Sequence, residues 1–360
     1  MILGIFSINN FPLNQLSLLY NLTLPELITL LASWGEPAYR ARQIWQGLYQ
    51  HFWNAPSQFT NLPTSLRTKL AESLCFDALA PTKSVESKDG QTRKTLFKLH
   101  DGLHIETVLM QYETRNTLCI STQVGCAMGC VFCATGQMGF KRHLSSGEIV
   151  AQVMYYARML HQSGEKVTNI VVMGMGEPFH NYDNTMAAID RLNDPHGYNF
   201  GARRFTISTV GLVPMIRRFA REKRQVNLAI SLHAADDVLR TSMLPVNKKY
   251  PLDEVLSACR DYVITTGRRI TFEWALIRGV NDTPEQACLL AEKLKGLLCH
   301  VNVIPLNPTP SYGGQATTRQ RAERFREILE QAGVSCTIRL RRGIDIQAGC
   351  GQLVSGEDIG

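Results

Sequence analysis

The chain has 360 residues, of which 44% are hydrophobic and 19% are charged. This length and composition allow a globular core, which excludes a disordered, collagen-like or coiled-coil protein. Lys and Arg outnumber Asp and Glu by 38 to 31, a balance compatible with a polyanionic partner but no proof of one. Ten cysteines in a chain this long favour intracellular thiols or metal ligands over a disulfide framework. We therefore expect a cytoplasmic protein.

The N-terminal segment is apolar and carries no charged side chain before Glu26. Asn9, Asn10 and Pro12 interrupt its apolar stretch, and no basic segment precedes it. We therefore expect neither a signal peptide nor a membrane span, and interpret residues 1–20 as an uncharged, weakly docked extension.

Residues 21–80 are expected to form a small helical module. Thr23 and Glu26 have the spacing of a capping box, which predicts a helix start. Apolar side chains recur at helical spacing after it. The expected helices cover residues 27–34, 44–49 and 65–74.

From residue 81 the pattern changes to short strands. Residues 94–99 and 102–110 predict a β-hairpin, and residues 81–112 are interpreted as a hairpin extension. Residues 113–345 then alternate between strands and helices. The expected strands cover residues 117–122, 167–173, 205–209, 226–232, 270–277, 301–306 and 335–340. The expected helices cover residues 146–160, 182–192, 213–221, 252–265, 284–297 and 319–332.

Six strand–helix repeats with apolar strands indicate a parallel sheet that closes fully or partly into a barrel. A complete eight-stranded barrel needs about 250 residues and more strands than this region supplies, so we expect a partial barrel. Ligand contacts in such folds lie at the C-terminal ends of the strands.

Three cysteines follow the first expected strand of this barrel, as Cys126, Cys130 and Cys133. Thiolates at this spacing can surround one metal centre. A structural zinc site needs four ligands, and the candidate nearby is His143, which leaves zinc as an alternative. In a cluster of four irons, three cysteines leave one iron open to a substrate or cofactor.

The sequence around these cysteines resembles the radical SAM superfamily and, within it, the RNA adenine methyltransferases of the RlmN and Cfr type. The resemblance extends from about residue 22 to residue 353. It is carried by residues 123–136, 174–178, 207–211, 231–234, 244–247, 266–269, 279–282, 302–307 and 349–353. It implies an α/β fold, a partial (βα)6 radical SAM barrel with an N-terminal helical RNA-binding module. It also implies one [4Fe-4S] cluster per chain and two S-adenosylmethionine (SAM) molecules per turnover.

By this resemblance, Cys126, Cys130 and Cys133 hold the cluster, whose open iron chelates SAM. The residues implied to contact SAM lie at the ends of successive expected strands. They are Gly176, Glu177, Ser208, Ser231, Leu232, His233 and Asn307. Taken alone, each is better interpreted as a turn residue or a locally satisfied polar side chain. A carboxylate such as Glu177 suits the methionyl ammonium of SAM.

The resemblance gives three further residues a catalytic role. Cys350 would become S-methylated, and Cys119 would be the resolving thiol that forms a transient disulfide with it. Residues 346–360 would be a flexible, exposed loop that brings Cys350 to the substrate. Glu106 matches the family's proton acceptor, and a carboxylate in an apolar pocket has a raised pKa that suits a general base. The alternative interpretation is that Cys119 and Cys350 are two unrelated thiols and that Glu106 is an ordinary strand glutamate. Gly349 departs from the family, which usually has alanine there.

The implied reaction methylates carbon 2 of an adenosine in the peptidyl transferase region of 23S rRNA, and of the adenosine 3′ of the anticodon in tRNAs. Cys350 accepts a methyl group, a radical made from a second SAM removes hydrogen from it, and the resulting methylene adds to the base. One alternative is methylation of carbon 8, as in the Cfr branch. Another is an iron–sulfur or zinc module that binds RNA without catalysis.

The expected partners are RNA and an electron donor such as flavodoxin, with no membrane partner, and the protein is expected to be a monomer. Residues 201–225 contain seven basic side chains against one acid, Glu222. The helical module adds Arg40, Arg42, Arg67 and Lys69 beside Trp34, Tyr39 and Trp45. Such groups suit a phosphate-tracking surface, although solvated charges and core aromatics are the ordinary interpretation.

Overall fold

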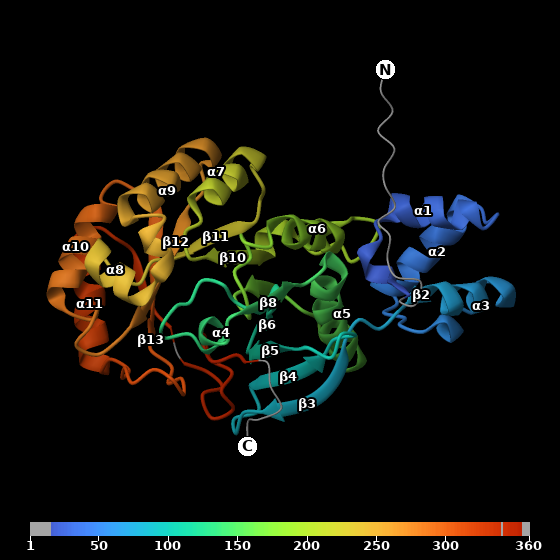
Figure 1. Cartoon of the computed structure of the whole chain (residues 1–360), viewed down its shortest axis with the longest axis horizontal. Helices are drawn as coiled ribbons and strands as arrows, with labels where there is room; N and C mark the ends of the chain where they lie inside the picture. The colour runs from blue at the N-terminus through green and yellow to red at the C-terminus, as the bar shows by residue number, and fades with distance from the viewer. Residues whose placement is uncertain (1–15, 340, 355–360) are drawn as a thin grey trace.

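A ten-stranded sheet organises the computed structural model, which describes residues 16–339 and 341–354 (Figure 1). Its parallel strands are, in sheet order, β14 (Cys336–Ile338), β13 (Cys299–Pro305), β12 (Ile270–Leu276), β11 (Asn227–Ser231), β10 (Phe205–Thr209), β9 (Asn169–Val172) and β6 (Arg115–Cys119). The first and last of these do not pair with each other, so the barrel is partial and open, as predicted.

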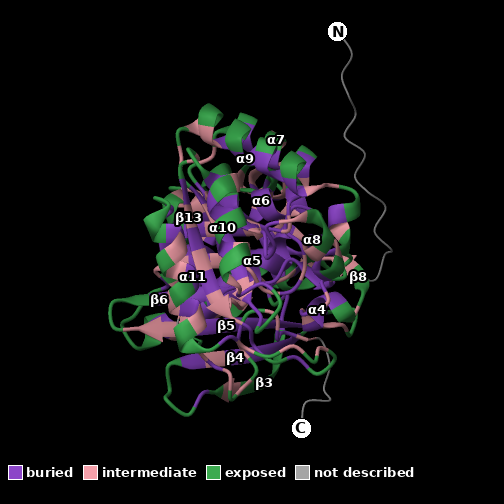
Figure 2. Ribbon diagram, turned by 90° about the vertical axis from the view of Figure 1, so that its left-hand side faces the viewer, coloured by how far each residue is buried: buried purple, intermediate pink, exposed green. Residues whose placement is uncertain are grey.

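Helices connect the successive parallel strands and cover the outside of the sheet. They are α5 (Ser146–Gln162), α6 (Tyr182–Asn193), α7 (Val213–Glu222), α9 (Leu252–Thr266), α10 (Pro284–Leu294) and α11 (Arg319–Gln331). α5 begins at a reciprocal capping box, in which Ser145 Oγ accepts from Glu148 N and the Glu148 carboxylate accepts from Ser145 N. The outward faces of α7, α9, α10 and α11 are exposed, whereas α5 is almost wholly buried, and the strands behind the helices are buried (Figure 2).

The hairpin extension is part of the same sheet. β4 (Thr92–Lys98) and β5 (His104–Tyr112) form the predicted hairpin, and β5 pairs with the first barrel strand, β6. The structure adds a third antiparallel strand, β3 (Ala80–Glu86), at the sheet edge. Almost every β3 side chain is exposed, so its sequence lacks the apolar alternation that predicts a strand.

The N-terminal module contains α1 (Leu24–Ser33), α2 (Ala38–Tyr49) and α3 (Thr64–Ser73). Of the expected extension, residues 1–15 lie outside the described residues. The rest is docked, contrary to expectation: β1 (Ser17–Leu18) pairs with β2 (Leu74–Cys75), and the segment after β1 packs against α5. Gly147 N in the first turn of α5 donates to the side-chain oxygen of Asn21 at 2.7 Å.

None of the helices within the described residues combines the length and apolar character that crossing a membrane requires.

Candidate active site

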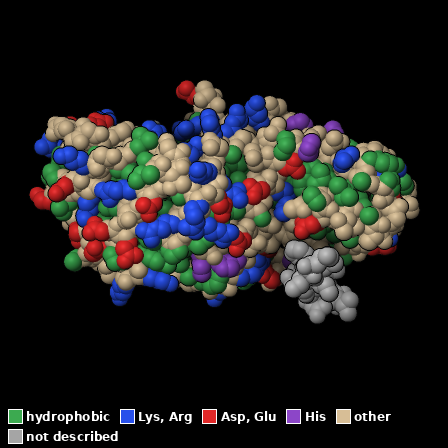
Figure 3. Space-filling view, turned by 90° about the horizontal axis from the view of Figure 1, so that it is seen from above, with side chains coloured by type: hydrophobic (Ala, Val, Ile, Leu, Met, Phe, Trp, Pro, Cys, Tyr) green, Lys and Arg blue, Asp and Glu red, His purple; other side chains and the backbone are tan. Residues whose placement is uncertain are grey.

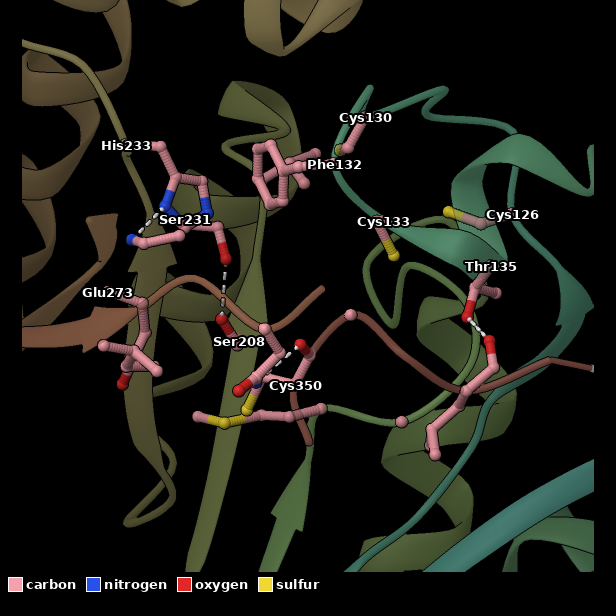
Figure 4. Close-up of a pocket in the computed structure, with 18 of the residues that line it drawn as sticks. Cys126, Cys130, Phe132, Cys133, Thr135, Ser208, Ser231, His233, Glu273 and Cys350 are labelled. Carbon is pink, nitrogen blue, oxygen red and sulfur yellow. Dashed lines mark hydrogen bonds between the residues drawn. The ribbon is translucent and has the colours of Figure 1, made fainter. Parts of the chain in front are cut away.

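A cavity opens at the C-terminal ends of the parallel strands, where the sequence predicted the ligand contacts. Its wall contains Cys126, Cys130, Cys133, Gly176, Glu177, Ser208, Ser231, His233, Asn307 and Cys350. Figure 4 shows the three cysteines of the motif on one side of this cavity, with Ser208, Ser231 and His233 across from them. Leu232 is the exception, because its side chain is buried in the apolar core and does not line the cavity. Side chains alternate along a strand, so a residue between two inward-facing neighbours points away.

The three cysteines of the motif occupy the loop between β7 (Gln123–Gly125) and the short helix α4 (Ala134–Gln137). Within the described residues, no three His, Cys, Asp or Glu side chains meet as closely as the ligands of one metal ion. A cluster of four irons takes each thiolate on a different iron, so its three cysteine ligands need not meet at one point. The candidate fourth zinc ligand, His143, is engaged elsewhere. Its Nδ1 lies 3.0 Å from Gln123 Nε2, within hydrogen-bond distance.

Burial raises the pKa of all three motif thiols, that of Cys126 to about 12. The cysteines are therefore neutral thiols without a metal, and binding of iron must displace their protons.

A tight hairpin supports the cysteine loop. β7 pairs with β8 (Phe140–His143), and Cys126 N donates to Gly139 O at 3.1 Å. Gly125 has a φ of +70°, and a Cβ added there would lie 1.8 Å from Gly139 O. Gly139 itself has a φ of +72°, but a Cβ there would meet nothing within 4 Å.

We predict that Gly125→Ala loses most of the bound iron, whereas Gly139→Ala keeps it. Both substitutions place alanine at a positive φ, which costs about 1 kcal/mol. Only Gly125→Ala also forces a backbone oxygen away, and this oxygen holds Cys126 in place. Iron and sulfide content after anaerobic reconstitution measures the difference, and equal contents in the two variants would contradict it.

The polar groups of the cavity fit SAM. Glu177 accepts hydrogen bonds from Phe179 N and Val210 N, each at 2.9 Å, and burial raises its pKa to about 7. The Oγ atoms of Ser208 and Ser231 lie 3.2 Å apart. A buried carboxylate suits an ammonium, and the two hydroxyls suit a ribose or carboxylate.

Asn307 supplies the clearest sign of a missing ligand. Its Nδ2 donates to Cys350 O at 3.1 Å, but its buried Oδ1 has no hydrogen-bond partner within the described residues. A buried amide oxygen without a donor is costly, and an amino group on a ligand in this cavity would satisfy it. The donor set of the cavity therefore fits the expected cofactor.

His233 occupies a strained position on the opposite wall. Its φ is +62°, and its Nδ1 accepts from Ala275 N at 2.9 Å. Burial lowers the pKa of His233 to about 3, so the ring is neutral and carries its proton on Nε2.

A second cavity contains both predicted catalytic cysteines. It shares Cys350 and Asn307 with the first cavity and adds Cys119. Both thiols are free in the structure, so the expected disulfide is not formed here. Burial raises the pKa of Cys119 to about 12.

The wall of this second cavity is basic. Arg339, Arg341 and Arg342 line it, together with Tyr112. The guanidinium groups of Arg115 and Arg342 lie over the Tyr112 ring at 4.2 and 4.3 Å from its centroid. Nothing in the sequence pattern of these three arginines connects them with Cys119.

Glu273 is a cavity residue that sequence analysis missed. It lines the first cavity, and Asn302 Nδ2 donates to its two carboxylate oxygens at 3.1 and 2.9 Å. Arg339 lies 3.9 Å from it and so connects the two cavities. The available signal was one acidic residue within the mostly apolar strand β12.

Glu106 is not brought together with the cysteines, because it lines neither cavity. Its carboxylate forms a buried ion pair with Lys94 Nζ at 2.8 Å and accepts from Val354 N at 2.9 Å. Burial raises the pKa of Glu106, although Lys94 opposes this effect. Leu353, the neighbour of Val354, lines both cavities, so the C-terminal segment covers Glu106.

The segment that carries Cys350 is more firmly held than the expected flexible loop. Ala134 N donates to Gly351 O at 2.8 Å, and Thr135 Oγ1 donates to Leu353 O at 2.6 Å (Figure 4). Gln352 Nε2 donates to Pro308 O at 2.8 Å. The first residues of α4, directly after the cysteine motif, thus hold the loop in the cavity. Residues 355–360 of the expected loop lie outside the described residues.

Three of the seven basic side chains in residues 201–225 form ion pairs with acids. Arg217 pairs with Asp261, Arg218 with Asp183, and Arg224 with Asp190. Figure 3 shows basic and acidic side chains beside each other on this side of the molecule. Because their charges are already paired with aspartates, these three arginines are less available to bind RNA phosphates than a count of basic residues suggests.

The aromatic residues of the N-terminal module differ in their exposure to solvent. Trp45 is buried in the core. Tyr39 is exposed with Arg40 over its ring at 4.9 Å, and Lys69 lies 4.9 Å from the ring of half-buried Trp34.

Comparisons with known proteins agree with this geometry. Residues 120–291 match the Radical SAM superfamily, and residues 18–76 match the ribosomal RNA large subunit methyltransferase N-terminal domain. The chain is 50% identical to the dual-specificity RNA methyltransferase RlmN 1 of Myxococcus xanthus, over 93% of each chain. It is 49% identical to a protein of Chloroflexus aurantiacus named "Probable dual-specificity RNA methyltransferase RlmN", over 95% of this chain and 93% of the relative.

A crystal structure of a radical SAM methyltransferase from Sphaerobacter thermophilus is also similar. It is 53% identical, covers 94% of this chain and 99% of its own, and superposes with a TM-score of 0.92.

Proposed function

Since the chain belongs to the RlmN family of radical SAM RNA methyltransferases, we propose that it methylates carbon 2 of an adenosine in 23S rRNA and in tRNA. The family uses a [4Fe-4S] cluster and SAM to methylate RNA. The finer steps proposed here are one cluster per chain, two SAM molecules per turnover and an S-methylated Cys350.

The observation that carries this proposal is that Cys350 lies between two cavities. The first contains the three motif cysteines and the polar groups that fit SAM. The second contains Cys119 and the arginine-rich wall. A thiol that accepts a methyl group in one cavity can therefore present it to a base in the other without a large movement. Guanidinium groups and a tyrosine at the second cavity suit the phosphates and the base of a splayed nucleotide.

Each residue then has one task. Cys126, Cys130 and Cys133 would hold the cluster, while Glu177, Ser208, Ser231, His233, Gly176 and Asn307 would hold SAM. When bound, these two groups supply the radical that removes a hydrogen atom from the methyl group. Cys350 accepts the methyl group and carries the methylene carbon to the base. Glu106 would accept the ring proton, and the adduct would return its unpaired electron to the cluster. The Cys119 thiolate would then free the product by attacking the Cys350 sulfur, so that the carbon–sulfur bond breaks as the disulfide forms and the released carbon takes a proton to become the methyl group.

Glu106 can do this only after the C-terminal segment moves, because Val354 now donates to its carboxylate. Binding of RNA in the second cavity would displace this segment and expose the carboxylate of Glu106. The proposal therefore includes a rearrangement of residues 353–354 on binding RNA.

The remaining partners are also proposed. A reductant such as flavodoxin would supply the electron for SAM cleavage, because the cysteine and tyrosine side chains at the site are not low-potential electron donors. The protein would act as a monomer in the cytoplasm, where ribosomal and transfer RNA are found.

Two measurements test the function. Anaerobically purified protein should contain about four irons and four sulfides per chain, and Cys126→Ala should lose them. RNA modified by the protein should contain 2-methyladenosine by nucleoside mass spectrometry with chromatographic standards. A zinc-only protein would overturn the radical reaction, and 8-methyladenosine alone would assign the Cfr-type reaction. Unmodified RNA would favour a binding module.

A further inference from the structure

Gln123 is a buried side chain of β7 that no step of the proposed reaction uses. Its Oε1 accepts from Glu177 N at 2.8 Å. Its Nε2 lies 3.0 Å from His143 Nδ1 and 3.1 Å from His180 Nδ1. This one amide therefore connects the backbone of a residue that would hold SAM with two histidines.

The hydrogen bonds of Gln123 fix the proton positions on both rings. Glu177 N can only donate, so the amide oxygen faces it and the amide nitrogen faces the histidines. This nitrogen has two hydrogens and accepts none, so each Nδ1 must accept one of them. An imidazole that accepts through Nδ1 carries its proton on Nε2 and is neutral. A proton added to either Nδ1 would set two donors against each other and break that contact.

The same contacts hold the turn that carries Glu177. Glu177 O accepts from His180 N at 3.0 Å, so His180 meets this turn through its backbone as well as its ring. Gly176 has a φ of +99° and packs on Gln123, because a Cβ added there would lie 2.5 Å from Gln123 Cβ. Displacement of the Gln123 side chain would therefore leave the N–H of buried Glu177 without its acceptor and loosen the turn.

Protons can reach both rings, because His180 is exposed and His143 is half-buried. The ring centroids lie 4.9 Å apart, and burial together with the neighbouring His180 lowers the pKa of His143. Charged side chains on β8, on the turn and on α6 have partners of their own or face solvent: Arg142 with Asp101 and Glu148, Glu177 with Phe179 N and Val210 N, Asp183 with Arg218, and exposed Lys141.

We propose that Gln123, His143 and His180 are positioning residues that hold the Glu177 backbone in its SAM-binding position only while both rings are neutral. The inference rests on the proposed function, in which Glu177 holds SAM. Protonation of a ring and binding of SAM then compete, so the affinity for SAM falls as the pH drops through the titration of the histidines and levels off above it. Because the pKa of His143 is lowered, its part of this fall lies below about pH 6.5, the ordinary value for histidine.

The first test measures SAM binding by the holoenzyme without a reductant, so that SAM is not cleaved. The dissociation constant is determined by equilibrium dialysis with labelled SAM from about pH 8 to about pH 5.5. The variant His143→Asn/His180→Asn keeps side-chain oxygens that can accept from Gln123 but cannot be protonated. It should match the wild type at the upper pH and bind SAM about threefold or more tightly than the wild type at the lower pH.

The comparison with the wild type isolates the histidines. Glu177, whose pKa is about 7, also titrates in this range, but it is present in both proteins. The matched control is His161→Asn, because His161 is exposed in the last turn of α5 and its ring contacts Phe52. This control should keep the pH profile of the wild type. Parallel profiles for the wild type and the double variant, or a changed profile in the control, would overturn the proposal.

The second test observes the ring protons directly. Long-range proton–nitrogen correlation spectra of the resting holoenzyme, labelled with nitrogen-15 on histidine, should show both rings with the proton on Nε2 at about pH 7.5. Gln123→Met removes the two donors and should let both rings exchange between tautomers. A proton on Nδ1 of either ring in the wild type would overturn the proposal. Neither test needs RNA, so a protein that binds SAM but leaves RNA unmodified would contradict the proposed function and leave this inference standing.

Discussion

Replacement of Cys119 by alanine should leave RNA covalently attached to Cys350. In the proposed sequence, the methylene carbon joins the Cys350 sulfur to the base, and a second thiol must attack that sulfur to release the product. Cys119 lines the same cavity as Cys350, and within the described residues no other cysteine outside the cluster motif lines either cavity. Release of methylated RNA should fall about a thousandfold. A denaturing gel should show a slow-moving protein–RNA species that nuclease removes.

The chain offers a matched control for this experiment. Cys259 is also buried, but it lies in α9 and lines neither cavity. Cys259→Ala should therefore release RNA normally. Adding Cys350→Ala to Cys119→Ala should abolish the adduct, since no methyl carrier remains. An adduct that persists in this double variant would place the covalent link elsewhere, and full turnover by Cys119→Ala would remove its proposed role.

The sequence allowed most of the barrel to be predicted because its strands are apolar and its helices are amphipathic. The five strands β9 to β13 fall within the expected ranges or within two residues of them. The edge strand β3 escaped this logic, whereas the other edge strand, β14, lies within its expected range. β3 pairs on one side and faces solvent, so its side chains follow no period. The docking of residues 17–21 also escaped, since only the tertiary structure shows that α5 receives them.

The candidate site was predicted unevenly, for a physical reason. Residues at strand ends gather at one rim in any parallel barrel, which explains why Ser208, Ser231 and Asn307 share a cavity. The position of the Cys350 segment depends instead on hydrogen bonds from α4, a contact between residues more than two hundred positions apart. Neither spacing nor periodicity encodes such a contact. For the same reason, Arg339 could not be connected with Cys119 or Glu273 before the structure was known.

The substitution Glu106→Gln should slow methylation about 100- to 10,000-fold while cluster content and Cys350 methylation stay unchanged. Glutamine keeps the size of the side chain and can still accept from Val354 N, but it cannot take a proton from the ring. Burial raises the pKa of Glu106 above its ordinary value. The single-turnover rate of the wild type should therefore fall as the pH drops through this raised pKa, since the carboxyl becomes protonated. Glu106→Gln should lack this acid limb.

The ion pair with Lys94 provides the stronger test of this role. Lys94 lies 2.8 Å from Glu106 and lowers its pKa against the effect of burial. Lys94→Met should therefore raise the pKa of Glu106 further and move the acid limb to higher pH. Glu177, whose pKa is about 7, could also produce an acid limb, but its contacts do not involve Lys94. An acid limb that stays in place in Lys94→Met would thus point to a base other than Glu106, whereas a shifted limb identifies Glu106 as the group that accepts the proton.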